Sequence, residues 1–144
     1  MAKTDRNKGH YETEHFTKMS RRLAFSPAYQ ALPCTAKALY IFVKLEWKGP
    51  RNNNNGSIRF STRQAAKRLG VNKDTAMKAF HQLQAKGFLH VTELGMLGVE
   101  GYGRGPSYEI TEIELPADTT RGGRRLFMKW TPGNDFEILR HTRR

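Results

Sequence analysis

The sequence has little cysteine, no long hydrophobic run and few acidic residues. Cys34 is the only cysteine among 144 residues, which excludes an internal disulfide bond and a zinc site built on cysteines. No apolar run approaches the roughly 20 residues that a membrane-spanning helix needs. Residues 1–10 are too polar for a secretory signal. We therefore expect a soluble protein of a reducing compartment, the cytoplasm.

The sequence also lacks the residue patterns that accompany catalysis and cofactor binding. Its five histidines show no metal-ligand spacing, and no serine, histidine and acidic residue are arranged as in a catalytic triad. The glycines of residues 98–105 do not follow a strand and open a helix, as those of a dinucleotide-binding loop would. We therefore expect no enzyme activity, no cofactor and no bound metal.

Positive charge is in large excess. Lysine and arginine together number 25 against 13 acidic residues, which gives a net charge of +12 and an isoelectric point near 10.2. A field of this sign attracts polyanions, and nucleic acid is the commonest large polyanion that a soluble protein meets. A ribosomal or chaperoned basic protein, or an incidental basic surface, is the alternative explanation of the same charge.

The pattern of apolar and turn residues divides the chain into three parts. Residues 1–25 hold six basic and three acidic residues and few that could form a core, so we expect a basic N-terminal arm with some order near its end. Residues 26–116 alternate helix-like and strand-like segments and predict one α+β domain. Residues 117–144 form a basic C-terminal extension, which includes a short apolar cluster at 126–130.

Local signals locate the elements of the domain. Ser61 and Gln64 have the spacing of a capping box, and Gly70 ends the helix that they begin. Asn72 is a favourable N-cap for the following helix, which Gly87 closes. Residues 94–106 contain five glycines and predict a long hairpin tip. Besides the helix between Ser61 and Gly70, we predict helices at 27–32, 35–47 and 73–86, and strands at 57–60, 88–93 and 107–113.

Two short helices joined by a tight turn and followed by a hairpin match a known arrangement. Residues 61–93 resemble the winged helix-turn-helix core of bacterial and phage DNA-binding proteins, such as MarR- and GntR-type regulators and the N-terminal domains of some phage and plasmid replication proteins. With the flanking helix and the hairpin, the resemblance covers residues 35–113. It implies a three-helix core with a small antiparallel β-sheet and a wing. The residues that carry it are Ala65, Leu69, Gly70, Val71, Thr75, Ala76, Leu83, Gly87 and Phe88.

The helix predicted at 73–86 has two faces of opposite character. In this kind of protein the second helix of the pair enters the DNA major groove, and its N-terminal half meets the base edges. A lysine there can donate to guanine, and Asp74 can accept from cytosine or simply favour the positive end of its own helix. The apolar face comprises Ala76, Ala79, Phe80 and Leu83, and the base-reading candidates are Lys73, Asp74, Thr75 and Lys78.

The distribution of charge along the chain supports the same docking. Residues 51–87 hold eight basic residues and one acidic residue, whereas residues 88–116 hold one basic and five acidic residues. Arg104, the sole basic residue of the second stretch, lies at the expected wing tip, where it could contact DNA or stand in solvent. We assign contacts with the DNA backbone to Arg59, Arg63, Lys67, Arg68, His81 and Gln82, and wing contacts to Tyr102 and Arg104.

Three functions remain open from the sequence. The first is a bacterial or phage transcriptional regulator, associated with the nucleoid, that acts as a homodimer through residues 126–130 or contacts RNA polymerase. The second is a replication or mobile-element accessory protein that binds repeated origin sites on double-stranded DNA and recruits replication proteins. The third is a structural RNA-binding protein, although the strands lack the aromatic platform that stacks RNA bases.

Overall fold

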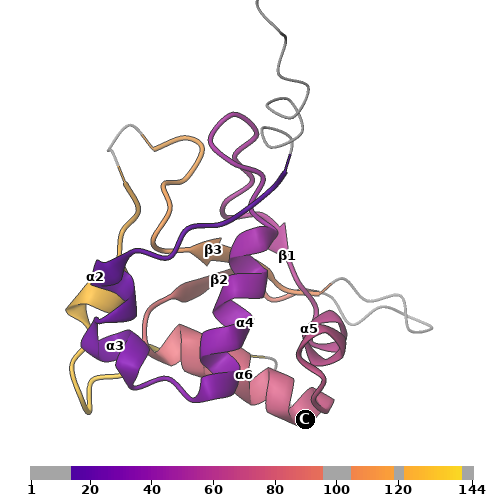
Figure 1. Cartoon of the computed structure of the whole chain (residues 1–144), viewed down its shortest axis with the longest axis vertical. Helices are drawn as coiled ribbons and strands as arrows, with labels where there is room; N and C mark the ends of the chain where they lie inside the picture. Colours follow the sequence, from indigo (N-terminus) through magenta and orange to yellow (C-terminus); the bar gives the residue numbers. More distant parts are fainter. Residues whose placement is uncertain (1–13, 96–104, 119–121, 141–144) are drawn as a thin grey trace, which may run out of the picture.

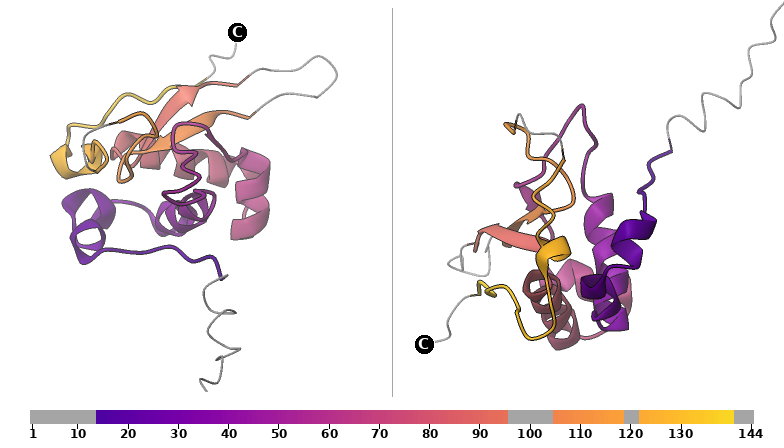
Figure 2. Two further views of the ribbon diagram at one scale, coloured as in Figure 1. Left: turned by 90° about the horizontal axis from the view of Figure 1, so that it is seen from above. Right: turned by 90° about the vertical axis from the view of Figure 1, so that its left-hand side faces the viewer.

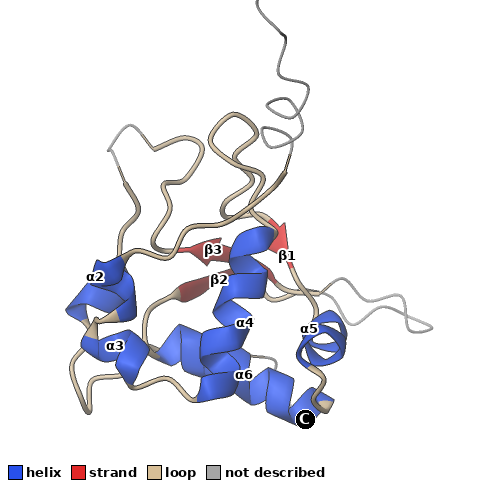
Figure 3. Cartoon of the chain, viewed as in Figure 1, coloured by secondary structure: helices blue, strands red, loops and turns tan. Residues whose placement is uncertain are grey.

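The computed structural model describes residues 14–95, 105–118 and 122–140 (Figure 1). In this part of the chain the protein is an α+β structure with five α-helices and one three-stranded antiparallel sheet (Figure 3). The helices are α2 (Arg21–Ala24), α3 (Pro27–Gln30), α4 (Cys34–Leu45), α5 (Thr62–Leu69) and α6 (Lys73–Ala85). The strands are β1 (Ile58–Arg59), β2 (Leu89–Glu93) and β3 (Ser107–Ile110), and a short 3-10 helix, η2, spans Leu126–Lys129.

The helices cover one face of the sheet, and the hydrophobic core lies between the two layers (Figure 2). Helix α4 packs against both α5 and α6, which also pack against each other. Aromatic rings connect the layers: Phe80 of α6 stacks on Tyr108 of β3 with ring centroids 5.2 Å apart. The core therefore fixes α6 against the sheet as well as against the other helices.

The signals that begin and end the helices act as predicted. Ser61 and Gln64 form a complete capping box at the start of α5, which satisfies backbone N–H groups that no helical carbonyl can reach. Gly70 ends α5 in the left-handed conformation with φ 70°. The Asn72 side chain accepts a hydrogen bond of 2.8 Å from the Thr75 N–H at the start of α6. The predicted helix–turn–helix succession is confirmed.

The sheet has the order β1-β3-β2, so β3 pairs with a strand on each side. All four residues of β3 are buried. The strand predicted at 107–113 is shorter than expected, because the Ile113 N–H donates to the Ile110 carbonyl at 3.1 Å and closes a turn. The prediction of a strand–hairpin–strand unit is confirmed for its two strands, and most of its tip lies outside the described residues.

The core also uses residues from both flanking regions, so the packed unit extends beyond 26–116. Leu23 is 1% exposed, Phe127 is 3% exposed and Trp130 is 7% exposed, and all three belong to the main core cluster. Phe127 stacks on Phe88 with ring centroids 4.8 Å apart. The interpretation of residues 126–130 as a dimer contact is therefore wrong for Phe127 and Trp130, because their rings pack in the core of their own chain.

Candidate nucleic-acid interface

Helix α6 buries one face and exposes the other. Ala76, Ala79, Phe80 and Leu83 are between 0% and 3% exposed, as their helical spacing predicts. The opposite face is open along the N-terminal half of the helix, where Met77 remains 39% exposed. An exposed polar face on a helix whose other face is anchored in the core is a rigid platform for recognition.

The four residues proposed to contact bases lie on the first turns of α6. Lys73, Asp74 and Lys78 are exposed, and the structure gives none of them an ion pair within the described residues. Thr75 is half-buried, and its backbone N–H is used by the Asn72 cap. Lys73, Asp74 and Lys78 are therefore free to bind a ligand. Thr75 is partly covered, and its backbone takes part in the cap that begins the helix.

A groove of about 770 Å³ runs between α6 and the β2–β3 hairpin. Its α6 side includes Lys78 and His81, and its sheet side includes Val91 and Tyr108. Burial lowers the pKa of His81 below the ordinary value of 6.5, and the positive charge of Arg140 lowers it further. An anion that entered the groove would favour the protonated imidazole, because opposite charge raises the pKa of a histidine.

The cations proposed to contact the DNA backbone fall into two groups. Arg63 and Lys67 project from α5 into solvent, with no carboxylate partner in the described part of the chain. Arg59 instead donates to the Gly105 carbonyl at 2.7 Å and to Glu93 at 3.3 Å. Arg68 pairs with the carboxylate of Glu46, the C-cap of α4, at 3.0 Å and lies over the Phe60 ring. The first group is available to phosphates without breaking an internal contact, and the second is not.

The other residues predicted to contact DNA are two on α6 and two at the wing. Gln82 is half-buried, and its backbone carbonyl accepts a hydrogen bond from the Lys86 backbone N–H at the end of α6. His81 is half-buried and lines the groove. Tyr102 and Arg104, the predicted wing contacts, lie outside the described residues.

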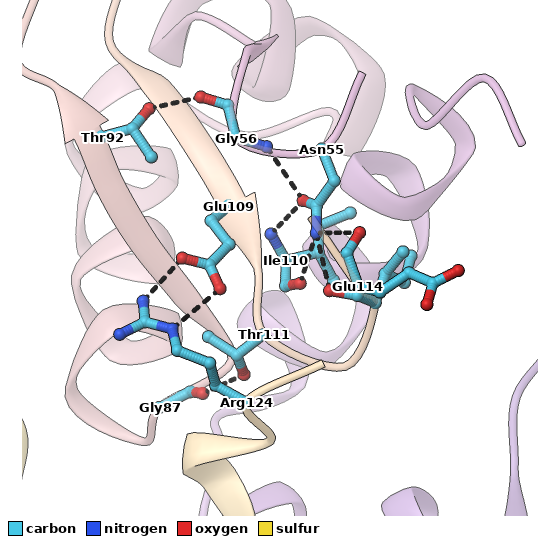
Figure 4. Close-up of polar contacts among 10 residues, drawn as sticks. Asn55, Gly56, Gly87, Thr92, Glu109, Ile110, Thr111, Glu114 and Arg124 are labelled. Atoms are coloured by element: carbon cyan, nitrogen blue, oxygen red, sulfur yellow. Dashed lines mark hydrogen bonds and ion pairs between the residues drawn. The ribbon is translucent and has the colours of Figure 1, made fainter. Parts of the chain in front are cut away.

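Two acidic residues of the sheet region, Glu109 and Glu112, have internal partners. Arg124 donates to both carboxylate oxygens of the 3%-exposed Glu109, at 2.9 and 2.6 Å (Figure 4). Glu112 pairs with the buried Lys44 at 3.0 Å and accepts a hydrogen bond from the Tyr40 hydroxyl. Part of the acidic charge of residues 88–116 is therefore neutralised by ion pairs within the protein. The separation of basic and acidic stretches along the sequence thus contributes less to the electrostatic field outside it.

Asn55 is a buried polar centre that the sequence does not reveal (Figure 4). Its amide nitrogen donates to the carbonyls of Ile110, Ile113 and Glu114, and its amide oxygen accepts from the Ile110 and Gly56 N–H groups. The run of four asparagines predicts a polar loop, but composition gives no signal that one of them completes the edge of β3.

Two further properties of residues 14–95, 105–118 and 122–140 bear on function. None of their helices has the length and hydropathy to span a bilayer. They also contain no cluster of three or more histidine, cysteine or acidic side chains that could hold a metal ion. Comparison with models of protein families, with curated proteins and with solved structures finds no match to this chain.

Proposed function

We propose that this chain is a sequence-specific double-stranded DNA-binding protein of the winged helix-turn-helix class. In this proposal α6 enters the major groove, α5 supports it and contacts phosphates, and the β2–β3 hairpin lies beside the duplex as the wing. The α+β architecture is compatible with this class. Regulation of transcription is the role that we propose for such binding.

The observation that carries the proposal is the exposed N-terminal half of α6. Lys73, Asp74 and Lys78 stand on one solvent-facing surface, and the Asn72 cap fixes the start of that helix. The α5 cations Arg63 and Lys67 are also exposed. A polar surface with unpaired cations on a rigid helix is suited to base edges and phosphates together.

Salt dependence tests the electrostatic part of the proposal. If about five to eight phosphates are neutralised, the logarithm of affinity should fall with the logarithm of salt concentration with a slope of about −5 to −7. Because Arg59 and Arg68 have internal partners, we expect the shallow end of this range. Gel-shift titrations on duplex DNA at several salt concentrations measure the slope, and a slope near zero would contradict the proposal.

A pair of lysine variants tests the recognition part. Lys78→Ala should weaken binding to the preferred duplex more than to random duplex, by about 1–3 kcal/mol if the lysine reads a base. Lys48→Ala is the matched control, because Lys48 is also exposed but lies beyond the C-terminal end of α4. An equal loss on both duplexes would make Lys78 a phosphate contact only.

The preferred duplex is obtained by selecting bound sequences from a random DNA pool. A palindromic motif would indicate a symmetric dimer, because symmetric half-sites match a two-fold protein. Footprinting on genomic DNA then separates the roles: sites that overlap promoters support regulation of transcription, and iterated origin repeats support replication. Preference for structured RNA over duplex DNA in competition would reject the proposal.

A further inference from the structure

The segment that follows η2 is fixed to the C-terminal half of α6 by a side-chain amide. The Gln84 Oε1 accepts a hydrogen bond of 2.9 Å from the Leu139 N–H, and its Nε2 donates to the Leu139 carbonyl at 3.4 Å. Gln84 is only 4% exposed. A buried glutamine that pairs with both backbone groups of one residue fixes the path of that residue as a neighbouring β-strand would.

The rest of the segment is held at several points before Leu139. The Phe136 N–H donates to the Ala85 carbonyl at 2.9 Å. Asp135 accepts hydrogen bonds from Trp130 Nε1 at 2.8 Å and from Lys86 Nζ at 3.0 Å. Figure 2 shows the segment running alongside α6 and β2, on the side away from α4. Residues 133–140, which we term the C-terminal strap, therefore have a defined course.

The C-terminal strap ends at the candidate interface. Leu139 and Arg140 line the same groove as Asp74, Lys78 and His81 of α6. Arg140 is exposed and has no carboxylate partner among the residues that the structure describes. Its charge is close enough to His81 to lower the pKa of that imidazole. The strap thus adds a free guanidinium to one wall of the groove.

The sign of the charge distinguishes a contact element from a cover. A segment that shields a cationic surface gains from carrying acidic residues, because opposite charges attract. The strap contains two acidic residues, Asp135 and Glu137, but Asp135 pairs with Lys86 and neither of the two lines the groove, whereas Arg140 does. At the groove, the strap therefore places one cation, Arg140, beside Lys78 of α6. That arrangement is unfavourable alone and becomes favourable when a polyanion lies between them.

We propose that the C-terminal strap is a second DNA contact, in which Arg140 donates to a backbone phosphate and Gln84 acts as its positioning residue. The inference rests on the proposed function and extends it. Arginine suits this position because its planar guanidinium can donate two parallel hydrogen bonds to one phosphate. The contact would add affinity without sequence preference, because phosphates carry no base information.

The test uses the full chain and the duplex chosen by selection. Arg140→Gln should lower affinity several-fold on preferred and random duplexes alike and reduce the salt slope by about 1. Lys129→Gln is the matched control, because Lys129 is also exposed and lies in the same region of the chain, on η2. It should leave both quantities unchanged.

The positioning role of Gln84 is tested by a double-mutant cycle. Gln84→Met retains the size of the side chain and removes its hydrogen bonds, so it should lower affinity, and adding Arg140→Gln should then cost little more. Additive losses would overturn the positioning role. Unaltered binding in Arg140→Gln, with normal binding by the wild type, would overturn the phosphate contact alone, and tighter binding would identify the strap as a cover. Failure of the wild type to bind duplex DNA would instead reject the proposed function.

Discussion

The side-chain amide of Asn55 pairs with both backbone groups of Ile110: its oxygen accepts from the Ile110 N–H at 2.7 Å and its nitrogen donates to the Ile110 carbonyl at 3.0 Å. Gln84 of α6 and Leu139 repeat this relationship. In both places a side-chain amide pairs with the backbone N–H and carbonyl that a neighbouring strand would otherwise bind. These polar groups are therefore satisfied without another strand.

Removal of the Asn55 amide should strongly destabilise the protein. Asn55→Ala leaves the Ile110 N–H and several carbonyls without a partner in a site where Asn55 is 2% exposed, and we expect a loss of about 2–4 kcal/mol in the free energy of unfolding. Urea denaturation followed by circular dichroism measures this loss. Asn52→Ala is the control, because Asn52 is exposed and should change stability by less than about 0.5 kcal/mol. Equal effects of the two substitutions would contradict this account.

Gly87 should not tolerate a side chain. Its φ is +86°, and a Cβ would lie 2.7 Å from the Phe136 ring and 2.8 Å from the Phe127 backbone nitrogen. We expect Gly87→Ala to cost about 3 kcal/mol or more, because left-handed strain is joined by a clash with backbone. Gly49→Ala has the same strain at φ +92° but meets no atom within 4 Å, and about 1 kcal/mol should follow. Thermal unfolding compares the two variants, and similar losses would show that the packing around Gly87 is not decisive.

His81 should titrate below the ordinary histidine range and affect stability accordingly. Because burial and then Arg140 lower its folded pKa from 6.5, the unfolded chain takes up the proton first as the pH falls. The contribution of His81 to the free energy of unfolding is therefore fully present above about pH 6.5 and is lost as the pH falls through the folded pKa. NMR titration of the imidazole measures this pKa directly.

The same titration separates the two causes of the His81 shift. Arg140→Gln should move the His81 pKa part of the way back toward 6.5, because burial still lowers it. Lys129→Gln should leave it in place. Addition of duplex DNA should raise it, because phosphate favours the charged ring. A His81 pKa that is insensitive to Arg140→Gln would show that the guanidinium does not act on the imidazole.

Loss of Arg124 alone should destabilise the protein more than loss of both charges of the Glu109–Arg124 pair. Glu109 is 3% exposed whereas the Arg124 side chain is 43% exposed. Arg124→Met therefore leaves a buried carboxylate without its bidentate partner, and we expect a loss of about 1–3 kcal/mol after allowance for the solvent exposure of the arginine. Adding Glu109→Gln to Arg124→Met should recover part of the loss, because no buried charge remains. Urea denaturation of the single and double variants measures the recovery, and its absence would contradict a charge-based cost.

Much of the fold was predictable because its signals are local. The Ser61 capping box, the Asn72 cap and the glycines at 70 and 87 specify where α5 and α6 begin and end. The spacing of the apolar residues also identifies the buried face of α6. Each of these signals acts within one or two helical turns and can be recognised without knowledge of the rest of the chain.

The features that sequence analysis missed depend on distant partners. Asn55 is one of four adjacent asparagines, and what distinguishes it is its burial and its contact with Ile110, 55 residues away. Arg59 resembles a phosphate contact in the sequence, but its partner Glu93 lies 34 residues away. Residues 117–144 appeared to be an extension because basic residues outnumber acidic ones there, yet the Phe127 and Trp130 rings close the core. Composition cannot report which apolar side chains meet across the fold.

The position of Trp130 gives the protein an internal optical reporter. Its indole donates to Asp135 and carries the Lys86 ammonium 4.8 Å above the ring, directly before the C-terminal strap. The second of the two tryptophans, Trp47, instead bonds to Asn53 in the asparagine loop. Since indole emission responds to nearby charge and polarity, a Trp47→Phe protein would leave a single emitter at the base of the strap. Docking or release of the C-terminal strap could then be followed in real time by the fluorescence of Trp130, without an attached dye.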